Sequence, residues 1–308
     1  MRNTFADTLT DCAAAHKGIM LLTGDLGFSV LEKFRAAFPD RFLNMGISEA
    51  NMIGAASGLA LSGMKPYAYS IIPFATMRCY EQIRNDVCYQ NADVKIVGVG
   101  SGLAYATLGP THHAREDVAI MGSLPNMTVV CPGDPIEAEL LTRESVHHQG
   151  PMYLRLGKGK DPVVHASKPS LRIGKGAVIR EGKDITLVAT GSILPNALAA
   201  AKLLMEKNIS VRLISMHTIK PLDEEIILKA AKDTNTIFTV EEHSVINGLG
   251  SAVGDALHAH SSKVPFRKLG LKDRFEQVVG SQDYLRKANG LLPEQISTAV
   301  FDELKVLR

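Results

Sequence analysis

The sequence has no tryptophan and no long run of apolar residues. A membrane span needs ~18–20 consecutive apolar residues, and windows such as Met52–Met64 are interrupted by Gly and Ser. Asp7 stands near the start, where a secretory signal would have its apolar region. We therefore expect a cytoplasmic protein that is neither secreted nor inserted into a membrane.

Motifs for metal and nucleotide binding are also missing. The four cysteines show no CxxC spacing, which indicates reduced thiols and not a zinc cage. Two pairs of adjacent histidines, His112-His113 and His147-His148, point their side chains in different directions and rarely bind one metal together. No GxxxxGK[ST] motif is present, which excludes a P-loop nucleotide site. We expect no metal site within this chain.

The charges are nearly balanced. Lys and Arg total 34 and Asp and Glu total 32, so the net charge is +2 and offers no basic footprint for nucleic acid. Hydrophobic residues make up 45% and charged residues 21%, which is typical of a globular protein with a large core. The length of 308 residues leaves room for two domains.

Apolar β-type runs alternate with helical stretches, which predicts α/β layers with mainly parallel sheets. The predicted strands are 18–24, 94–100, 127–131, 152–156, 184–190, 210–215 and 236–241. The predicted helices are 4–16, 48–61, 77–88, 115–121, 135–147, 195–207, 223–232, a helix ending near 259, and 293–304. Since the stretch 157–176 is rich in Gly, Pro and Lys, we predict two consecutive α/β domains, 1–165 and 177–308, joined by a linker at 166–176.

A glycine-rich segment, Gly248–Gly254, follows a predicted strand and opens a helix. Its spacing is GxGxxxG and not the dinucleotide pattern GxGxxG. Such glycines more often allow close packing of a helix on a sheet, so we favour that interpretation over a nucleotide site.

Glu49 stands at the start of a predicted helix, after Ser48 as a natural N-cap. An acidic residue in the first turn complements the helix dipole, which is the simpler explanation of its presence. The helix that follows is built almost wholly of small and apolar residues, which favours burial and close approach of another chain. A carboxyl group at the mouth of such a helix is also a candidate functional group.

Three further residues allow two interpretations each. His112 follows Gly109-Pro110 in a loop and is either a surface turn residue or a functional histidine. Arg155 alternates with apolar residues at the end of a predicted strand, as expected for a structural ion pair or for a phosphate ligand at the sheet edge. Ser29 follows another strand end.

Taken together, these residues lie in an ordered set of motifs that resembles the transketolase family of thiamine diphosphate enzymes. The motifs are Gly46–Ala50, Phe74–Arg84, Gly109–Ala119, Pro125–Asp134 and Glu241–Gly250. The resemblance covers essentially the whole chain. It corresponds to the C-terminal half of a full transketolase, which consists of the pyrimidine-binding domain and the C-terminal domain.

The resemblance implies a cofactor-binding set. Glu49 matches the glutamic acid that hydrogen-bonds a nitrogen of the aminopyrimidine ring and so favours the reactive tautomer of thiamine diphosphate. Phe74 matches the aromatic residue that stacks on this ring. Ile47, Asp25 and Leu26 are expected to complete the cofactor site.

It also implies a substrate-binding set. His112 matches a histidine that contacts the substrate near the reacting carbonyl and is expected to be catalytic. Arg155 and Ser29 match residues that hold the sugar phosphate, and Arg2 is a further candidate for that contact.

The half that is missing predicts a partner. The family holds its divalent metal, Mg²⁺ or Ca²⁺, and the diphosphate with a Gly-Asp-Gly motif and a downstream Asn. The Gly-Asp pairs here, Gly24-Asp25 and Gly133-Asp134, lack that pattern. The chain is therefore expected to be one subunit of a split transketolase, in an α₂β₂ assembly with an N-terminal-type subunit that holds the metal and diphosphate.

The chain departs from the family where the sugar is bound. Gly98–Gly102 stands where a histidine is typical, Thr107-Leu108 replaces an acidic pair, and Ile71 replaces a phenylalanine. We therefore expect unusual donor or acceptor sugars, transferred as a two-carbon ketol unit.

Three alternatives remain open at this stage. The chain could be the β-type component of a 2-oxo acid dehydrogenase or part of a deoxyxylulose-phosphate-synthase-like enzyme. It could also be a non-catalytic assembly subunit that has kept the fold.

Overall fold

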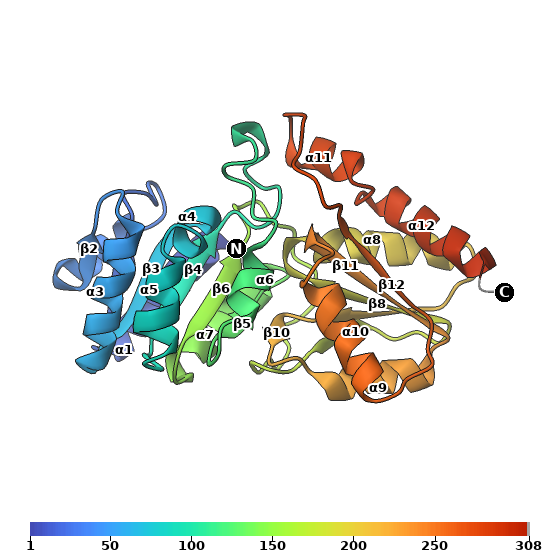
Figure 1. Ribbon diagram of the computed structural model, residues 1–308, viewed down its shortest axis with the longest axis horizontal. Helices are drawn as coiled ribbons and strands as arrows, with labels where there is room; N and C mark the ends of the chain where they lie inside the picture. The colour runs from blue at the N-terminus through green and yellow to red at the C-terminus, as the bar shows by residue number, and fades with distance from the viewer. Residues whose placement is uncertain (307–308) are drawn as a thin grey trace.

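The chain folds around two sheets that are mainly parallel and that follow one another along the sequence (Figure 1). The computed structural model describes residues 1–306. One sheet has seven strands in the order β10-β5-β6-β4-β3-β1-β2, and the other has five in the order β12-β11-β8-β9-β7. Among their pairs, only β10–β5 and β7–β9 are antiparallel. The predicted fold class is confirmed.

The first half of the chain supplies six strands of the larger sheet. They are β1 Ile19–Thr23, β2 Phe42–Asn44, β3 Lys65–Ile71, β4 Lys95–Val99, β5 Thr128–Val130 and β6 Met152–Leu156. The helical segments between them are α1 Arg2–Ala15, α2 Glu32–Ala37, η1 Pro39–Arg41, α3 Glu49–Leu61, α4 Ile72–Thr76, α5 Tyr80–Gln82, η2 Ile83–Cys88, η3 Ala106–Leu108, α6 Asp117–Gly122 and α7 Pro135–His147. Every residue of β1, β4 and β6 is buried, because helices cover both faces of a parallel sheet.

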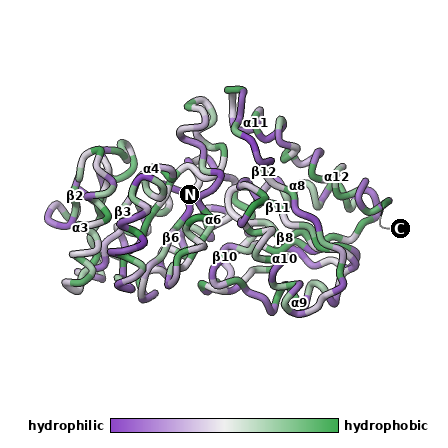
Figure 2. The backbone as a smooth tube through the Cα atoms, in the orientation of Figure 1, coloured by the Kyte–Doolittle hydropathy of each residue, from purple (hydrophilic) through white to green (hydrophobic). Residues whose placement is uncertain are grey.

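The second half repeats the pattern. Its strands are β7 Ala177–Arg180, β8 Ile185–Thr190, β9 Val211–Ser215, β10 Thr218–Lys220, β11 Thr236–Ser244 and β12 Phe266–Leu271. Its helices are η4 Gly191–Ile193, α8 Leu194–Glu206, α9 Glu224–Asp233, α10 Leu249–Ala259, α11 Gln282–Ala288 and α12 Pro293–Val306. Hydrophobic and hydrophilic residues alternate along α12 (Figure 2), because one face of this helix packs on α8 and the other faces water.

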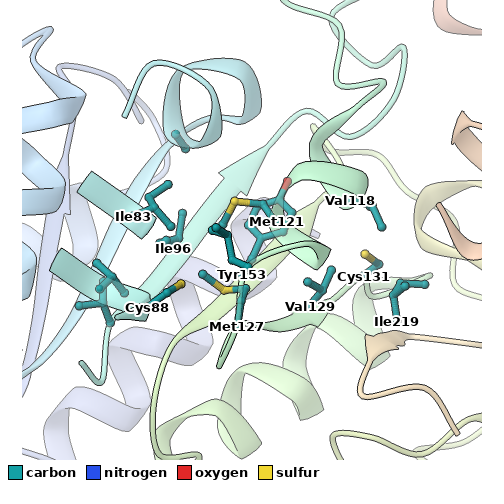
Figure 3. Close-up of a cluster of buried hydrophobic side chains, with 14 of the residues drawn as sticks. Ile83, Cys88, Ile96, Val118, Met121, Met127, Val129, Cys131, Tyr153 and Ile219 are labelled. Carbon is teal, nitrogen blue, oxygen red and sulfur yellow. The ribbon is translucent and has the colours of Figure 1, made fainter. Parts of the chain in front are cut away.

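One of the hydrophobic clusters contains residues from both halves of the chain. Strand β10 belongs to the second half of the sequence but pairs with β5 in the larger sheet. Ile219 of β10 lies beside Val129, Cys131 and Val118 in a cluster that continues to Ile83 of η2 (Figure 3). The predicted division at 166–176 falls in the irregular stretch between β6 and β7 and stays a prediction, with β10 crossing back over it.

The helical stretch predicted around 77–88 is confirmed for residues 80–88, but it starts later than predicted and ends as a π-helix. Helix α4 ends at Thr76, Met77–Cys79 form a turn, and the chain continues as the short α5 and the π-helix η2. Cys79 leaves helical geometry, with φ −118° and ψ 24°. This interruption turns Arg78 towards the start of α3.

None of the helices in residues 1–306 is long and apolar enough to cross a membrane.

Candidate active site

Glu49 lies at the first position of α3 with its carboxyl group buried. The residue is only 1% exposed. Its Oε1 accepts a hydrogen bond from the hydroxyl of Ser70 over 3.3 Å, and its Oε2 accepts one from Nη1 of Arg78 over 2.7 Å. Ser48 makes no side-chain cap here, so the simple capping explanation of this helix start is not what the structure contains. The carboxyl points away from solvent and is held by side chains from β3 and the turn after α4.

Arg78 joins Glu49 to Phe74. Besides the ion pair with Glu49, its guanidinium carbon lies 4.2 Å from the centre of the Phe74 ring. The Arg78 side chain is 42% exposed, while that of Glu49 is 1% exposed. The buried carboxylate is thus covered by a flat cation that is itself open to water on one side.

His112 also contacts Phe74. The rings of Phe74 and His112 meet edge to face with centres 5.2 Å apart, and the ring of Tyr105 lies 6.2 Å from His112. The hydroxyl of Thr111 shares a hydrogen bond of 2.9 Å with Nδ1 of His112. This bond and the two rings fix the orientation of the imidazole, which stays partly exposed.

Tyr105 fills the space above Gly100, at the carboxyl end of β4. Gly100 has φ +92°, and a β-carbon there would lie 2.1 Å from the Tyr105 ring, so only glycine fits. Burial raises the pKa of Tyr105, and the charge of nearby Arg2 opposes this rise. Tyr105 is therefore a bulky neighbour of His112 that packs on Gly100, within the segment Gly98–Gly102 where a histidine is expected from the resemblance.

Two cations border Tyr105. Nζ of the exposed Lys158 lies 4.7 Å from the centre of the Tyr105 ring. Arg2 begins α1, and its Nε is buried without a hydrogen-bond partner. Lys158 was not among the predicted residues. It stands two residues after β6 ends, and that position is the signal that could have found it, because ligands of parallel sheets bind at the carboxyl ends of strands.

Arg155 forms the structural ion pair that the sequence allowed, and its predicted contact with a sugar phosphate stays a prediction. Arg155 is 1% exposed, and its Nε and Nη2 bond to Asp117 over 2.7 and 3.2 Å. Nη2 also donates to the carbonyl oxygens of Ala114 and Glu242. The residue is a structural ion-pair partner that ties β6 to α6 and β11. Its side chain points into the core because its position in the strand faces α6.

Asp117 shows how tightly this pair is held. Burial is the largest single influence and would raise the pKa of its carboxyl. The Arg155 charge, the His243 charge and the hydrogen bonds from Arg155 and Tyr153 together outweigh burial and hold the pKa below its usual value. Tyr153 adds a hydrogen bond of 2.6 Å to the same carboxylate.

The remaining predicted residues lie in two neighbouring loops. Asp25 has φ +54° and exchanges hydrogen bonds with the side chain of Asn44, while Leu26 is partly buried in the core. Ser29 is exposed, with its backbone N–H bonded to Glu32. Ile47 is 76% exposed. Gly24, directly before Asp25, packs against the Glu49 carboxyl, so this loop adjoins the buried glutamate.

The site residues therefore follow one edge of the larger sheet. β6, β4, β3 and β1 are neighbours in that order. Side chains near the carboxyl ends of these strands contact one another in a continuous row. In order, the row consists of Lys158, Tyr105, His112, Phe74, Arg78 and Glu49. The loop between β4 and α6, which carries Tyr105 and His112, rises above this edge in Figure 1.

Comparison with known families decides what this arrangement belongs to. Residues 1–162 match the family model "Transketolase, pyrimidine binding domain", and residues 174–296 match "Transketolase, C-terminal domain". The chain belongs to the transketolase family.

Individual relatives are similar over their whole length. A protein described as a transketolase C-terminal section of Methanocaldococcus jannaschii is 37% identical over 99% of this chain and 96% of its own. A 6-deoxy-6-sulfo-D-fructose transketolase subunit of Clostridium sp. (strain MSTE9) is 36% identical over 98% and 94%. A solved split-gene transketolase, described as an inactive β4 tetramer, is 37% identical and superposes with a TM-score of 0.90 over 100% of this chain and 98% of that one.

Transketolases depend on thiamine diphosphate, and the residues around Glu49 fit its pyrimidine end. Arg78 provides the test, because its guanidinium is flat, carries N–H donors, covers Phe74 and donates to Glu49. An aminopyrimidine ring has the same flat shape, and its ring nitrogen can share a proton with the same carboxyl oxygen.

For the diphosphate end of the cofactor, the described residues of this chain offer no comparable set of ligands. Within residues 1–306, no group of three or more His, Cys, Asp and Glu side chains is arranged to hold a metal ion. Asp25, the acidic residue of the first Gly-Asp pair, is engaged with Asn44, and Asp134 of the second pair is buried as the N-cap of α7.

Proposed function

We propose that this chain is the pyrimidine-binding subunit of a split, thiamine diphosphate-dependent transketolase. In the complex it transfers a two-carbon ketol unit from a ketose donor to an aldose acceptor. The observation that carries this proposal is the buried Glu49 carboxyl beside Phe74, at the start of a helix made of small residues, in a chain that corresponds to a transketolase C-terminal section.

Bound thiamine diphosphate supplies the nucleophilic carbon that accepts the two-carbon unit and passes it on. Glu49 holds the proton between its carboxyl oxygen and the pyrimidine ring nitrogen, and burial protects that proton from exchange with water. Phe74 covers one face of the ring. Asp25, Leu26 and Ile47 line the cofactor from the loops before α2 and α3.

His112 contacts the substrate. With Nδ1 engaged by Thr111, its Nε2 is free to meet a hydroxyl group or the oxygen of the reacting carbonyl. The edge-to-face contact between His112 and Phe74 supports this role, because Phe74 is the residue proposed to cover the cofactor ring.

The substrate carries an anionic group at its far end. Lys158 and Arg2 place two cations around Tyr105, at the end of the row opposite to Glu49. Ser29 is a further proposed contact. The name of the Clostridium relative specifies a sugar with a terminal sulfonate, which is the class of group that such a pair of cations holds.

An N-terminal-type subunit supplies the diphosphate and Mg²⁺ or Ca²⁺ site and docks on α3. Gly54 and Gly58 have no atom within 4 Å of a built β-carbon, and Ile47 and Leu61 at the two ends of the helix are 76% and 65% exposed. This face is small and apolar, as a close helix–helix interface requires. We expect an α₂β₂ complex in the cytoplasm, consistent with the four free, buried cysteines.

The test is reconstitution with an N-terminal-type subunit of roughly 250–300 residues that carries Gly-Asp-Gly followed by Asn. We expect ketol transfer and tight thiamine diphosphate binding by the complex, and neither by the chain alone. Assays of 2-oxo acid decarboxylation and of pyruvate–aldehyde condensation separate the two alternative enzymes.

Glu49→Gln separates catalysis from assembly. This variant cannot give a proton to the ring nitrogen, so we expect at least a hundredfold loss of kcat with an unchanged complex size. Glu206→Gln, at an exposed position of α8, is the matched control. Normal turnover by the complex with Glu49→Gln would contradict the catalytic role of Glu49 and favour a non-catalytic assembly subunit.

A further inference from the structure

Arg78 occupies the place where the proposed function puts the cofactor ring. Its Nη1 lies 2.7 Å from Oε2 of Glu49, and its guanidinium carbon lies 4.2 Å from the centre of the Phe74 ring. Glu49 and Phe74 are the two residues proposed to bind one edge and one face of the pyrimidine. A ring bound to both cannot share that space with the guanidinium.

From this geometry we infer that Arg78 is an internal stand-in for the pyrimidine ring. The Arg78 side chain occupies the ring site in the cofactor-free chain and moves out into solvent when the cofactor binds. The inference rests on the proposed function and concerns a step before the reaction. Arg78 is a positioning residue, since it acts through Glu49.

Two features allow this exchange. The guanidinium side chain is 42% exposed, so it has a route into water, whereas Glu49 is 1% exposed and has none. Arg78 also stands in the turn between α4 and α5, where Cys79 is not helical, and not in a continuous helix that would fix its direction.

The exchange also explains why a buried carboxylate is tolerated without cofactor. A buried charge that loses its partner is costly, and within residues 1–306 Arg78 is the cation that pairs with Glu49. When the guanidinium leaves, one proton is taken up from water and shared between the carboxyl oxygen and the incoming ring nitrogen, so the carboxyl keeps a hydrogen-bond partner. Ser70 stays on the second oxygen, Oε1.

The competition predicts the sign of the effect on cofactor affinity. Binding of the ring must displace one ion pair that is partly exposed and one contact of a cation with an aromatic face, each of modest strength. Without Arg78 neither contact opposes binding. We expect Arg78→Met to bind thiamine diphosphate about five- to thirtyfold more tightly than the unchanged complex.

The experiment measures the Kd of thiamine diphosphate for the heteromeric complex by calorimetry. Arg84→Met is the matched control, because Arg84 is exposed and its side chain bonds only to Asn85 among the described residues. Arg78→Gln is the second variant, in case the apolar methionine disturbs folding. Tighter binding by both Arg78 variants, with Arg84→Met unchanged, supports the stand-in. Unchanged or weaker binding overturns it, since a merely structural arginine or one that holds the cofactor gives those results.

A second measurement uses the chain alone and a ring without diphosphate. The probe is 4-amino-2-methylpyrimidine, followed by nuclear magnetic resonance. Arg78→Met is expected to bind it at least fivefold more tightly than the unchanged chain, and equal binding contradicts the stand-in. Should the unchanged complex fail to bind thiamine diphosphate at all, the proposed function fails by itself, and the ring titration still decides the role of Arg78.

Discussion

A β-carbon built on Gly24 would lie 3.2 Å from Oε1 of Glu49, closer than most such contacts allow. Gly24 follows β1 directly, and Glu49 begins α3, so the two meet only because β1 ends beside the start of that helix. The glycine lets the strand end approach a carboxyl group that must stay buried.

Gly24→Ala should therefore disturb the site more than the fold. The added methyl group pushes the carboxyl of Glu49 by a few tenths of an ångström, and a small misplacement of a catalytic group is costly to rate. We expect kcat of the complex to fall about tenfold or more, with the free energy of unfolding changed by less than about 1 kcal/mol. Gly122→Ala, which meets no atom within 4 Å, is the control. Full activity of Gly24→Ala would show that the carboxyl has room to shift.

Lys158→Gln should change substrate affinity and not chemistry. The side chain is exposed at the end of the contact row that lies farthest from Glu49, so it can hold an anionic sugar terminus without touching the reacting carbon. We expect KM for a sugar phosphate or sulfonate to rise about tenfold, with kcat nearly unchanged, and little effect on an uncharged sugar. Lys160→Gln, on the same exposed segment, is the control. Equal losses for charged and uncharged sugars would contradict this role.

Arg155→Met should destabilise the chain. Arg155 and Asp117 form a fully buried pair, and removing one partner leaves an uncompensated charge, which costs about 3–5 kcal/mol. Urea denaturation of the chain alone measures this loss. A double-mutant cycle with Asp117→Asn gives the coupling between the two side chains. Normal stability combined with a raised KM would restore the substrate role that the sequence suggested.

The stability of the chain should depend on His243 in acid. Burial is the main cause that lowers the pKa of His243 to about 4, and the Arg155 charge adds to it, while Asp117 opposes it. Glu241 lies 3.7 Å away, and Nε2 of the histidine has no partner. The unfolded chain binds a proton near pH 6.5 that the folded chain refuses until about pH 4. The contribution of His243 to the free energy of unfolding is therefore fully present above pH 6.5 and decreases as the pH drops towards 4.

His243→Asn removes that dependence. We expect the free energy of unfolding of the unchanged chain to fall by on the order of 2–3 kcal/mol between pH 6.5 and 4 from this group, and His243→Asn to lack that part of the slope. Chemical denaturation at several pH values measures it. Identical slopes for both proteins would mean that His243 is protonated in the fold. The same pH series needs Glu241→Gln, because burial raises the pKa of Glu241 to about 7 and its contribution has the opposite sign.

Most long buried strands could be predicted, but the short and the mixed ones could not. Apolar runs such as 184–190 and 152–156 can be predicted as strands, since a parallel strand covered on both faces is mostly apolar. Strand β3 starts with Lys65 and Pro66, which do not resemble a central strand, and β10 has three residues whose pairing with β5 depends on contacts across the domain boundary. The start of the helical stretch around 77–88 is misplaced by three residues, because the composition does not reveal the turn at Met77–Cys79.

The sequence by itself determined the α/β class, the order of the motifs and the transketolase resemblance, because these depend on residue types and spacing along the chain. It also singled out Glu49, Phe74 and His112. Only the tertiary structure decided that Arg155 is sealed in an ion pair while Lys158 faces the sheet edge, and that Arg78 covers Glu49. Those outcomes depend on which side chains strand register and helix breaks bring together in space, and spacing along one chain does not encode such distances.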